Sequence, residues 1–375
     1  MAVTSKGTAA GLVDWRTVER LTALIPAGPS ASRSARASSV AVLRRSALEA
    51  PAWVARITGL NRAAQQVAET TRVSVVDRAG LVRVSTRALR GLMEQVPAPQ
   101  ASEAVRLVGA AEMAGAMSLL ATRLLGQVVP ATGTGADGDG GRGGEASPHL
   151  LLVAPNVLAM RRQLDLDMLD LPAWVCLHEM THAVQLAAAP WLGPYLSDSM
   201  RMVIGAVVEA VYGGPGGGAD GTGEQGLRRR PGRAARIAAR AGRGRVLEGL
   251  TNFKERSEVA SLAAALTFLE GHAEVVLDDV HPNRMPSVHR LRAVLSRSRA
   301  ADAGIGPGPG LGSLLLHRLM GLEAKEAQYA DGTAFVRSVV ARIGHEGLNV
   351  VWTDPALLPA PAEIARPDVW VRRVS

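Results

Sequence analysis

Residues 171–190, LPAWVCLHEMTHAVQLAAAP, constrain the fold of this 375-residue chain more than any other stretch. Apolar residues surround the few polar side chains on all sides, which is typical of a helix buried in a protein core. Asp170 stands where an N-cap is expected, and Pro190 ends the run. Because an unpaired polar group is costly to bury, the polar side chains of this helix need partners.

The polar side chains of this helix form the pattern H-E-x-x-H, with His178, Glu179 and His182. Histidines four positions apart on a helix share one face, so both imidazoles can reach a single metal ion. Two imidazoles suit zinc, and a glutamate directly after the first histidine takes a proton from zinc-bound water in such sites. The alternative is a core helix whose histidines are merely hydrogen-bonded, and the apolar surroundings disfavour it.

A catalytic zinc ion usually has three protein ligands and one water, so a third ligand must come from elsewhere in the chain. Residues 251–280 predict a long, largely buried helix in which Glu270, Glu274 and Asp278 recur every four positions on one face. Carboxylates stacked in an apolar helix repel one another unless a positive group lies opposite. We predict Glu270 as the third ligand, with Glu274 and His272 as the alternatives.

The other acidic residues of this stripe are predicted to support the ligands from outside. Glu274 lies one turn after Glu270 and can accept a hydrogen bond from the second nitrogen of a ligand histidine, and Asp278 is a further candidate for this role. Gly271 and Ala273 are small, so they would let this helix approach the motif helix closely.

Hydrolysis of a peptide also needs a donor for the developing oxyanion. The sequence offers two tyrosines and two histidines for this role and does not rank them. These candidates are Tyr195, Tyr329, His281 and His289.

The composition limits the other possibilities. Cys176 is the only cysteine, which excludes an intrachain disulfide and a cysteine-based zinc site. The first residues lack the apolar stretch of a secretory signal, and no run of 18 uncharged apolar residues predicts a membrane span. We therefore expect a cytoplasmic protein with no membrane partner.

The net charge of +8 comes from one short segment. Residues 228–245 contain eight arginines and no acidic residue, so the rest of the chain is neutral overall. A nucleic acid would be a candidate partner for this segment, but the segment has no aromatic residue on which a base could stack. We therefore expect a solvated insertion rather than a nucleic-acid site.

Composition also divides the chain into regions. Residues 1–131 are predicted to be mostly helical, and residues 132–148 form a glycine-rich loop. Residues 149–300 contain the candidate site and are predicted to be the core, interrupted by a glycine- and arginine-rich insertion at 213–247. Residues 301–375 are predicted to form helices and a tail that pack on this core.

Several elements near the candidate site have their own signals. Val73 begins a predicted short strand with a turn at Asp77–Gly80, and residues 28–38 read as a polar loop. Ser102–Val129 predicts one long helix. His149–Ala154 predicts an apolar strand, which either offers an edge to an extended substrate backbone or is an ordinary core strand.

The motif residues resemble the gluzincin branch of zinc metallopeptidases. In that branch H-E-x-x-H is joined by E-G-x-A or E-x-x-x-D on a second helix, and the first glutamate of that pattern binds zinc. Here Glu270-Gly271-x-Ala273 matches the first form, while Glu274 stands where the second form has an aspartate. The separation between His182 and Glu270 is far longer than in most gluzincins, and the insertions explain part of it.

More closely, the chain resembles an actinobacterial family of zincin-like metallopeptidases of unassigned substrate. Some members of that family are labelled as associated with the biosynthesis of a deazaflavin coenzyme. The resemblance spans nearly the whole chain and is carried by VVDRAG (75–80), LLGQ (124–127), LLLVAPN (150–156), WVCLHEMTHAVQ (174–185), PWL (190–192), TFLEGHAEVVLD (267–278) and GLEAKEAQYADG (321–332).

This resemblance implies a predominantly α (α+β) zincin-like fold, with a helical N-terminal region and a small β-sheet beside the H-E-x-x-H helix. It implies a zinc metallopeptidase with one Zn²⁺ per chain and a peptide or protein as substrate. The alternative is a zinc-containing protein that does not cleave peptides and instead binds a partner or takes part in cofactor metabolism.

Overall fold

The computed structural model describes residues 7–130, 148–212, 253–300 and 327–375. These residues form a predominantly helical fold with two small sheets, which confirms the predicted fold class. The insertion predicted at 213–247, and all but Pro148 of the predicted glycine-rich loop, lie outside the described residues. The predicted boundaries between regions remain predictions.

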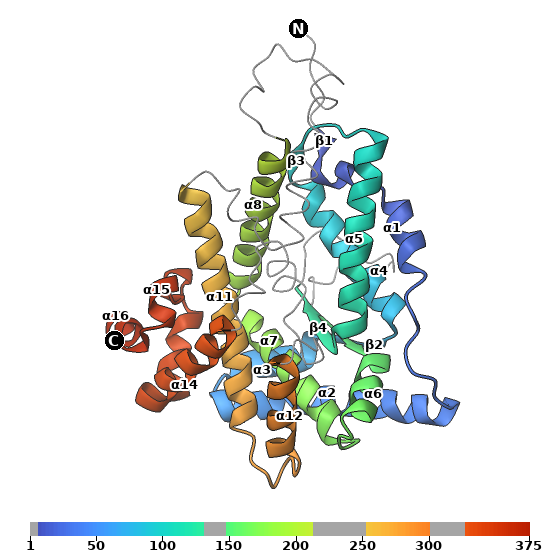
Figure 1. Ribbon diagram of the computed structural model, residues 1–375. Helices are drawn as coiled ribbons and strands as arrows, with labels where there is room; N and C mark the ends of the chain where they lie inside the picture. Colours follow the sequence, from blue (N-terminus) through green and yellow to red (C-terminus); the bar gives the residue numbers. More distant parts are fainter. Residues whose placement is uncertain (1–6, 131–147, 213–252, 301–326) are drawn as a thin grey trace.

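A three-stranded sheet lies beside the motif helix (Figure 1). Strand β5 (His149–Val153) occupies its centre, with β2 (Arg72–Val76) parallel on one side and β4 (Gly126–Val129) antiparallel on the other. The residues from Leu150 to Val153 are completely buried, as expected of a central strand covered on both faces. The strand predicted around His149 is therefore an ordinary core strand, and the edge strand that contacts the motif helix is β4.

Two predictions around this sheet are wrong. The turn predicted at Asp77–Gly80 is instead the start of helix α4 (Arg78–Glu94), because the Asp77 carboxylate caps the helix and accepts the Gly80 N–H at 2.7 Å. The long helix predicted up to Val129 ends earlier, as α5 (Glu103–Arg123), and β4 follows it. Pairing with β5 decides the conformation of this short segment, whose own pattern also suited a helix.

Helices α2 (Arg33–Thr58) and α3 (Asn61–Thr70) pack against the motif helix. Helix α2 begins directly after Ser32, whose hydroxyl accepts the Ala35 N–H at 3.1 Å. The loop predicted at residues 28–38 is therefore wrong over its second half, since this serine cap starts the helix there. Gly59 ends α2 in the left-handed conformation, with φ of 76°, which glycine adopts without steric cost.

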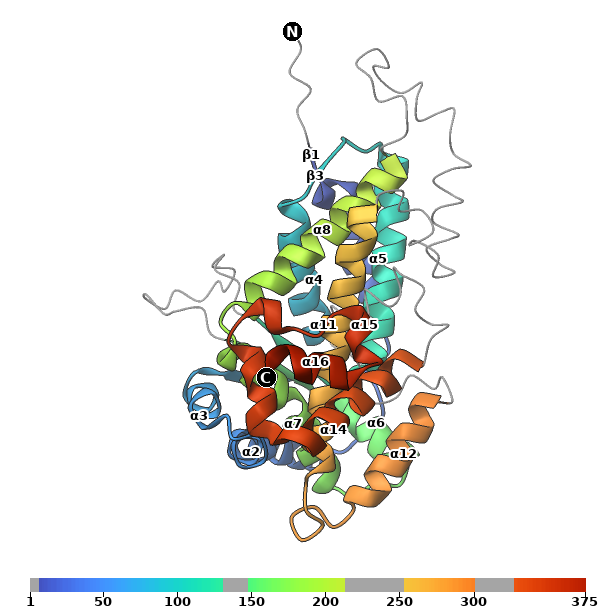
Figure 2. The same ribbon diagram turned by 90° about the vertical axis from the view of Figure 1, so that its left-hand side faces the viewer.

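Several long helices extend from the sheet toward the N-terminal end of the molecule (Figures 1 and 2). Helix α8 (Leu192–Tyr212) contacts both α4 and α11 (Phe253–Asp278), while α5 contacts α4 and α1 (Trp15–Thr22). The remaining elements of this part are β1 (Gly7–Thr8) and β3 (Pro97–Ala98), which pair antiparallel, and the 3-10 helix η1 (Ala9–Leu12). Helix α6 (Ala154–Gln163), which contacts α2 and the motif helix, and helix α12 (Val288–Ala300) lie at the opposite end of the molecule (Figure 1).

The C-terminal elements cover one side of α11 (Figure 2). They are α14 (Ala327–Leu348), η4 (Asn349–Trp352), η5 (Pro355–Leu357), α15 (Pro361–Ile364) and α16 (Pro367–Val374). Helices α11 and α14 approach so closely that a Cβ on Gly271 would lie 2.3 Å from the carbonyl carbon of Gly332. The role predicted for Gly271 is therefore corrected, because its missing side chain makes room for α14 and not for the motif helix.

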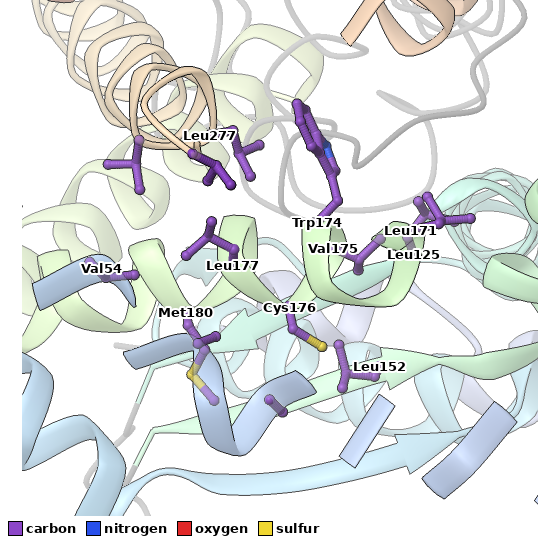
Figure 3. Packing of buried hydrophobic residues seen from close by; sticks show 14 of the residues in the cluster. Val54, Leu125, Leu152, Leu171, Trp174, Val175, Cys176, Leu177, Met180 and Leu277 are labelled. Carbon is purple, nitrogen blue, oxygen red and sulfur yellow. The ribbon is translucent and has the colours of Figure 1, made fainter. Parts of the chain in front are cut away.

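The motif helix, α7 (Asp170–Ala188), lies in the largest hydrophobic cluster. Figure 3 shows its apolar side chains packed between the sheet and α11. The same cluster contains Val54, Leu125, Leu152 and Leu277 from the surrounding elements. Cys176 is fully buried, and this burial raises the pKa of its thiol, as expected of a core residue. The prediction of a buried helix at this position is confirmed.

The N-cap predicted for α7 is wrong. Asp170 is the first residue of the helix, and its carboxylate accepts the Ser287 N–H at 2.7 Å and the Ser287 hydroxyl. The carboxylate of Asp167 instead accepts the backbone N–H groups of Leu169 and Asp170, at 2.7 and 2.9 Å. The helix start is thus held by a side chain three residues earlier, while Asp170 ties α7 to the start of α12.

Two of the described helices are long and apolar enough to cross a membrane by length and composition alone. They are residues Glu103–Arg123 and Ser257–Asp278. The second is two-thirds buried inside the protein (67%) and carries Glu270, so its apolar surface is accounted for by the core.

Candidate metal centre

Helices α7 and α11 bring three candidate ligands together. His178 and His182 lie one turn apart on α7, and Glu270 lies on α11, which packs against α7. One ligand atom from each of these residues lies within 4.8 Å of the others, and no other such group is found among the described residues. His178 is fully buried, whereas the side chains of His182 and Glu270 keep 18% and 12% of their surface exposed.

The spacing of the ligand atoms suits a tetrahedral ion. The Nε2 atoms of the two histidines are 3.3 Å apart, and carboxylate oxygens of Glu270 lie 3.4 Å from His178 Nε2 and 3.7 Å from His182 Nε2. A tetrahedral zinc ion with bonds of about 2.0–2.1 Å separates its ligand atoms by about 3.3–3.4 Å. Two imidazole nitrogens and one carboxylate are also a donor set that catalytic zinc uses, so these residues fit the metal.

The charges of the histidines and of Glu270 shift one another's pKa values. Burial alone would lower the pKa of His182, but the charge and hydrogen bonding of Glu270 raise it to about 9. Burial alone would raise the pKa of Glu270, but the two histidines hold it well below its usual range. Glu270 is therefore an anion that faces the histidines, as a metal ligand must be.

Glu179 is buried between α7 and strand β4. A Cβ on Gly126 would lie only 2.6 Å from the Glu179 Cγ, so the glutamate side chain rests directly on the glycine backbone. The Glu179 carboxylate also accepts a backbone hydrogen bond from Val128. Burial is the largest influence on this group, and it raises the pKa of Glu179 above the usual value for a carboxyl. A carboxylate with a raised pKa is a better proton acceptor near neutral pH.

Strand β4 turns its outer edge toward Glu179. Hydrogen bonding to β5 alternates along an antiparallel strand, and the Val153 N–H donates to the Leu125 carbonyl at 2.8 Å. By this alternation the backbone groups of Gly126 and Val128 point away from β5, which agrees with the Val128 hydrogen bond to Glu179. Gly126 is buried, whereas Val128 is partly exposed.

The two residues predicted to support the ligands lie in different surroundings. Glu274 Oε1 is 3.8 Å from His178 Nδ1, which is longer than a hydrogen bond. Asp278 is ion-paired with Arg292, at 3.2 Å, and with Arg337. The structure thus directs Asp278 toward arginines, because α12 and α14 bring guanidinium groups to the end of α11.

The alternative ligand and the predicted oxyanion donors are placed as follows. His272 lies two residues after Glu270 but packs against Phe268 and Trp352, and burial lowers its pKa to about 3. The hydroxyl of Tyr195 is hydrogen-bonded to Ser199, and its ring meets that of Trp191 edge-on. The side chain of Tyr329 lies outside the described residues. His281 and His289 are exposed near the start of α12.

The sequence interpretation missed two residues that touch the site. Gly126 was included in a predicted helix, so its position against Glu179 was not anticipated. Gln185 hydrogen-bonds to His182 Nδ1 at 2.9 Å. The signal for Gln185 was present, because a residue three positions after His182 lies on the same helix face. For Gly126 there was no local signal, since the contact depends on how the sheet meets α7.

Comparison with known proteins agrees with this geometry. A family model described as zincin-like metallopeptidase matches residues 13–371. The chain belongs to the zincin-like metallopeptidase family. This family membership implies a metal, typically zinc, and the buried His–His–Glu group could bind such an ion. The predicted actinobacterial origin and the deazaflavin label stay predictions.

A solved structure shares the fold of this zincin-like chain. It is a protein from Chloroflexus aurantiacus, described as a candidate hydrolase with a novel fold, with a TM-score of 0.58 and 21% sequence identity. The similarity covers 96% of this chain and 98% of that protein, so it extends over the whole architecture. No curated protein matches the chain.

Proposed function

We propose that this protein is a zinc-dependent metallopeptidase that hydrolyses peptide bonds with an activated water. The observation that carries the proposal is the spacing of the ligand atoms, 3.3 Å between the Nε2 atoms of His178 and His182 and 3.4 Å from His178 Nε2 to Glu270. A buried glutamate, Glu179, follows the first of these histidines directly. This is the arrangement that metal-assisted hydrolysis requires.

In this proposal the chain's own residues have distinct roles. His178, His182 and Glu270 would hold the zinc ion, which supplies Lewis-acid polarisation of a carbonyl and acidifies water when bound. Glu179 accepts the proton of the attacking water at its carboxylate and returns it to the leaving amine. Its raised pKa suits both steps, because a group that accepts a proton and then releases it works best near the ambient pH.

The substrate in this proposal is a peptide or protein in an extended conformation. An extended backbone can add to the exposed edge of a sheet, and β4 is an edge strand among the described residues. Val128 is partly exposed and its backbone carbonyl points away from β5, so this end of β4 is where a substrate backbone would pair. Pairing there would place the scissile bond near Glu179, which accepts a hydrogen bond from Val128.

The test combines metal content with peptide cleavage. Purified protein would be assayed for zinc by elemental analysis and incubated with a mixed peptide library whose cleaved ends are read by mass spectrometry. We expect about one zinc per chain and cleavage by the wild type. Glu179→Gln should keep the zinc and reduce cleavage by a factor of at least about 100, since a general base typically contributes 10²–10⁴-fold. Glu270→Ala should lose the zinc.

Glu94→Gln is the matched control. It makes the same chemical change on α4, where Glu94 is exposed and ion-paired with Arg90, so zinc and cleavage should both remain. Cleavage by Glu179→Gln at the wild-type rate would contradict the proposed role of this residue. Stoichiometric zinc without cleavage of any peptide would favour the alternative, a zinc-containing protein that binds a partner or serves cofactor metabolism.

A further inference from the structure

Gln185 is a buried polar residue that joins the two ligand-bearing helices. It lies on α7 three residues after His182, and only 1% of its surface is exposed. Its Oε1 atom is 2.9 Å from His182 Nδ1. Its Nε2 atom is 2.9 Å from the Leu269 carbonyl oxygen and 3.0 Å from His272 Nδ1, both on α11. All of its polar atoms therefore have partners.

The partners of Gln185 determine which way its amide points. A backbone carbonyl can only accept, so the atom facing Leu269 must be the amide nitrogen. The amide oxygen then faces His182, and the His182 Nδ1 must donate its proton to it. An imidazole with its proton held on Nδ1 has the Nε2 lone pair available. That Nε2 is the atom that lies 3.3 Å from His178 Nε2 and 3.7 Å from Glu270.

We propose that Gln185 is a positioning residue of the metal centre, which fixes the tautomer and ring orientation of His182 and ties that ligand to the backbone of α11 beside Glu270. The inference rests on the zinc site of the proposed function. The link to α11 is at Leu269, directly before Glu270, so one side chain sets the position of ligands on both helices. A residue without these hydrogen bonds would remove this restraint on the His182 ring.

The two ligand histidines are supported differently. His178 Nδ1 faces the Glu274 carboxylate at 3.8 Å, whereas His182 Nδ1 meets a neutral amide at hydrogen-bonding distance. A carboxylate at the position of Gln185 would have faced the Leu269 carbonyl and His272 Nδ1, which are both acceptors. Only an amide can donate to these two groups and accept from His182 at the same time.

The test measures zinc affinity and fold stability separately. Zinc dissociation constants would be determined by competition with a chromophoric chelator, and unfolding midpoints of the metal-free protein by urea denaturation. Gln185→Met keeps the length of the side chain and removes its hydrogen bonds. We expect its zinc dissociation constant to rise about 10–100-fold, the usual effect of losing a partner of a metal ligand. Gln185→Glu keeps an acceptor for His182 but cannot donate to Leu269 and His272, so its zinc affinity should fall between those of the wild type and Gln185→Met.

Asn156→Leu is the matched control for a purely structural effect. Asn156 is also a buried amide that donates to two backbone carbonyls, those of Ala121 and Leu124, but none of its described hydrogen bonds involves a metal ligand. This variant should have a lower unfolding midpoint and a zinc dissociation constant within about threefold of the wild type. An equal loss of zinc affinity in Asn156→Leu would overturn the inference, because affinity would then follow fold stability alone.

Two other outcomes would also decide the matter. A dissociation constant for Gln185→Met within about threefold of the wild type would refute the positioning role while leaving the proposed function intact. A wild type that binds no zinc would refute the proposed function and this inference together.

Discussion

The contact between Gly126 and Glu179 allows a sharp test of how the proposed base is held. In Gly126→Ala the new Cβ would lie 2.6 Å from the Glu179 Cγ, whereas ordinary contact begins at 3.4 Å. The glutamate side chain must therefore retreat by about 0.8 Å, because the glycine belongs to a strand paired with β5 and yields less easily. A misplacement of about 1 Å in a catalytic group can reduce the rate about 100-fold, or about 2.7 kcal/mol in activation free energy.

The assay for Gly126→Ala is peptide cleavage at saturating substrate, together with zinc content and urea unfolding. We expect kcat to fall about 100-fold while zinc remains bound, since the ligands themselves are not displaced. Overpacking should also lower the free energy of unfolding by about 1–3 kcal/mol. Gly91→Ala is the control, because a Cβ on Gly91 in α4 would meet nothing within 4 Å. A Gly126→Ala enzyme with the wild-type kcat would refute the reasoning that Gly126 determines the position of Glu179.

Two further predictions concern charge. In the metal-free protein Glu270 raises the pKa of His182 from 6.5 to about 9, so the stability from this pairing is complete below pH 6.5 and is lost as the pH rises through about 9. Because zinc must displace that proton, the apparent zinc affinity should increase about tenfold per pH unit up to about pH 9. Chelator competition at several pH values measures this slope, and a pH-independent affinity would contradict the prediction. Asp278→Ala should lower the urea unfolding midpoint, because it breaks the ion pairs with Arg292 and Arg337. Its zinc affinity should stay within about threefold of the wild type. A large loss of affinity would instead indicate that Asp278 supports the ligands.

The metal centre could be anticipated largely from local pattern. The helix period places His178 and His182 on one face, and the apolar surroundings require that such polar groups have a partner. A second buried helix with an acidic stripe supplies the matching carboxylate, so the meeting of Glu270 with the histidines followed without knowledge of the tertiary structure. The residue types alone were enough for this prediction, because two histidines and a carboxylate are unusual in an apolar core.

The surroundings of the centre could not be anticipated in the same way. The stretch from Ser102 to Val129 suits a helix throughout, and only pairing with β5 makes its end a strand. The acidic stripe on α11 reads as one unit, but its members separate because Asp278 meets arginines from α12 and α14. Contacts of this kind join residues distant in the chain, and they have no periodicity that a sequence could reveal.

The sequence by itself therefore determined the helical class of the protein and the buried motif helix, and it predicted that His178, His182 and Glu270 lie together. The tertiary structure decided which strand lies beside Glu179, which helix Gly271 accommodates and which partners Gln185 has. The physical reason is that ligand chemistry and helix periodicity are local properties of the chain. Close packing, edge pairing and the orientation of a buried amide depend on what lies across the interface.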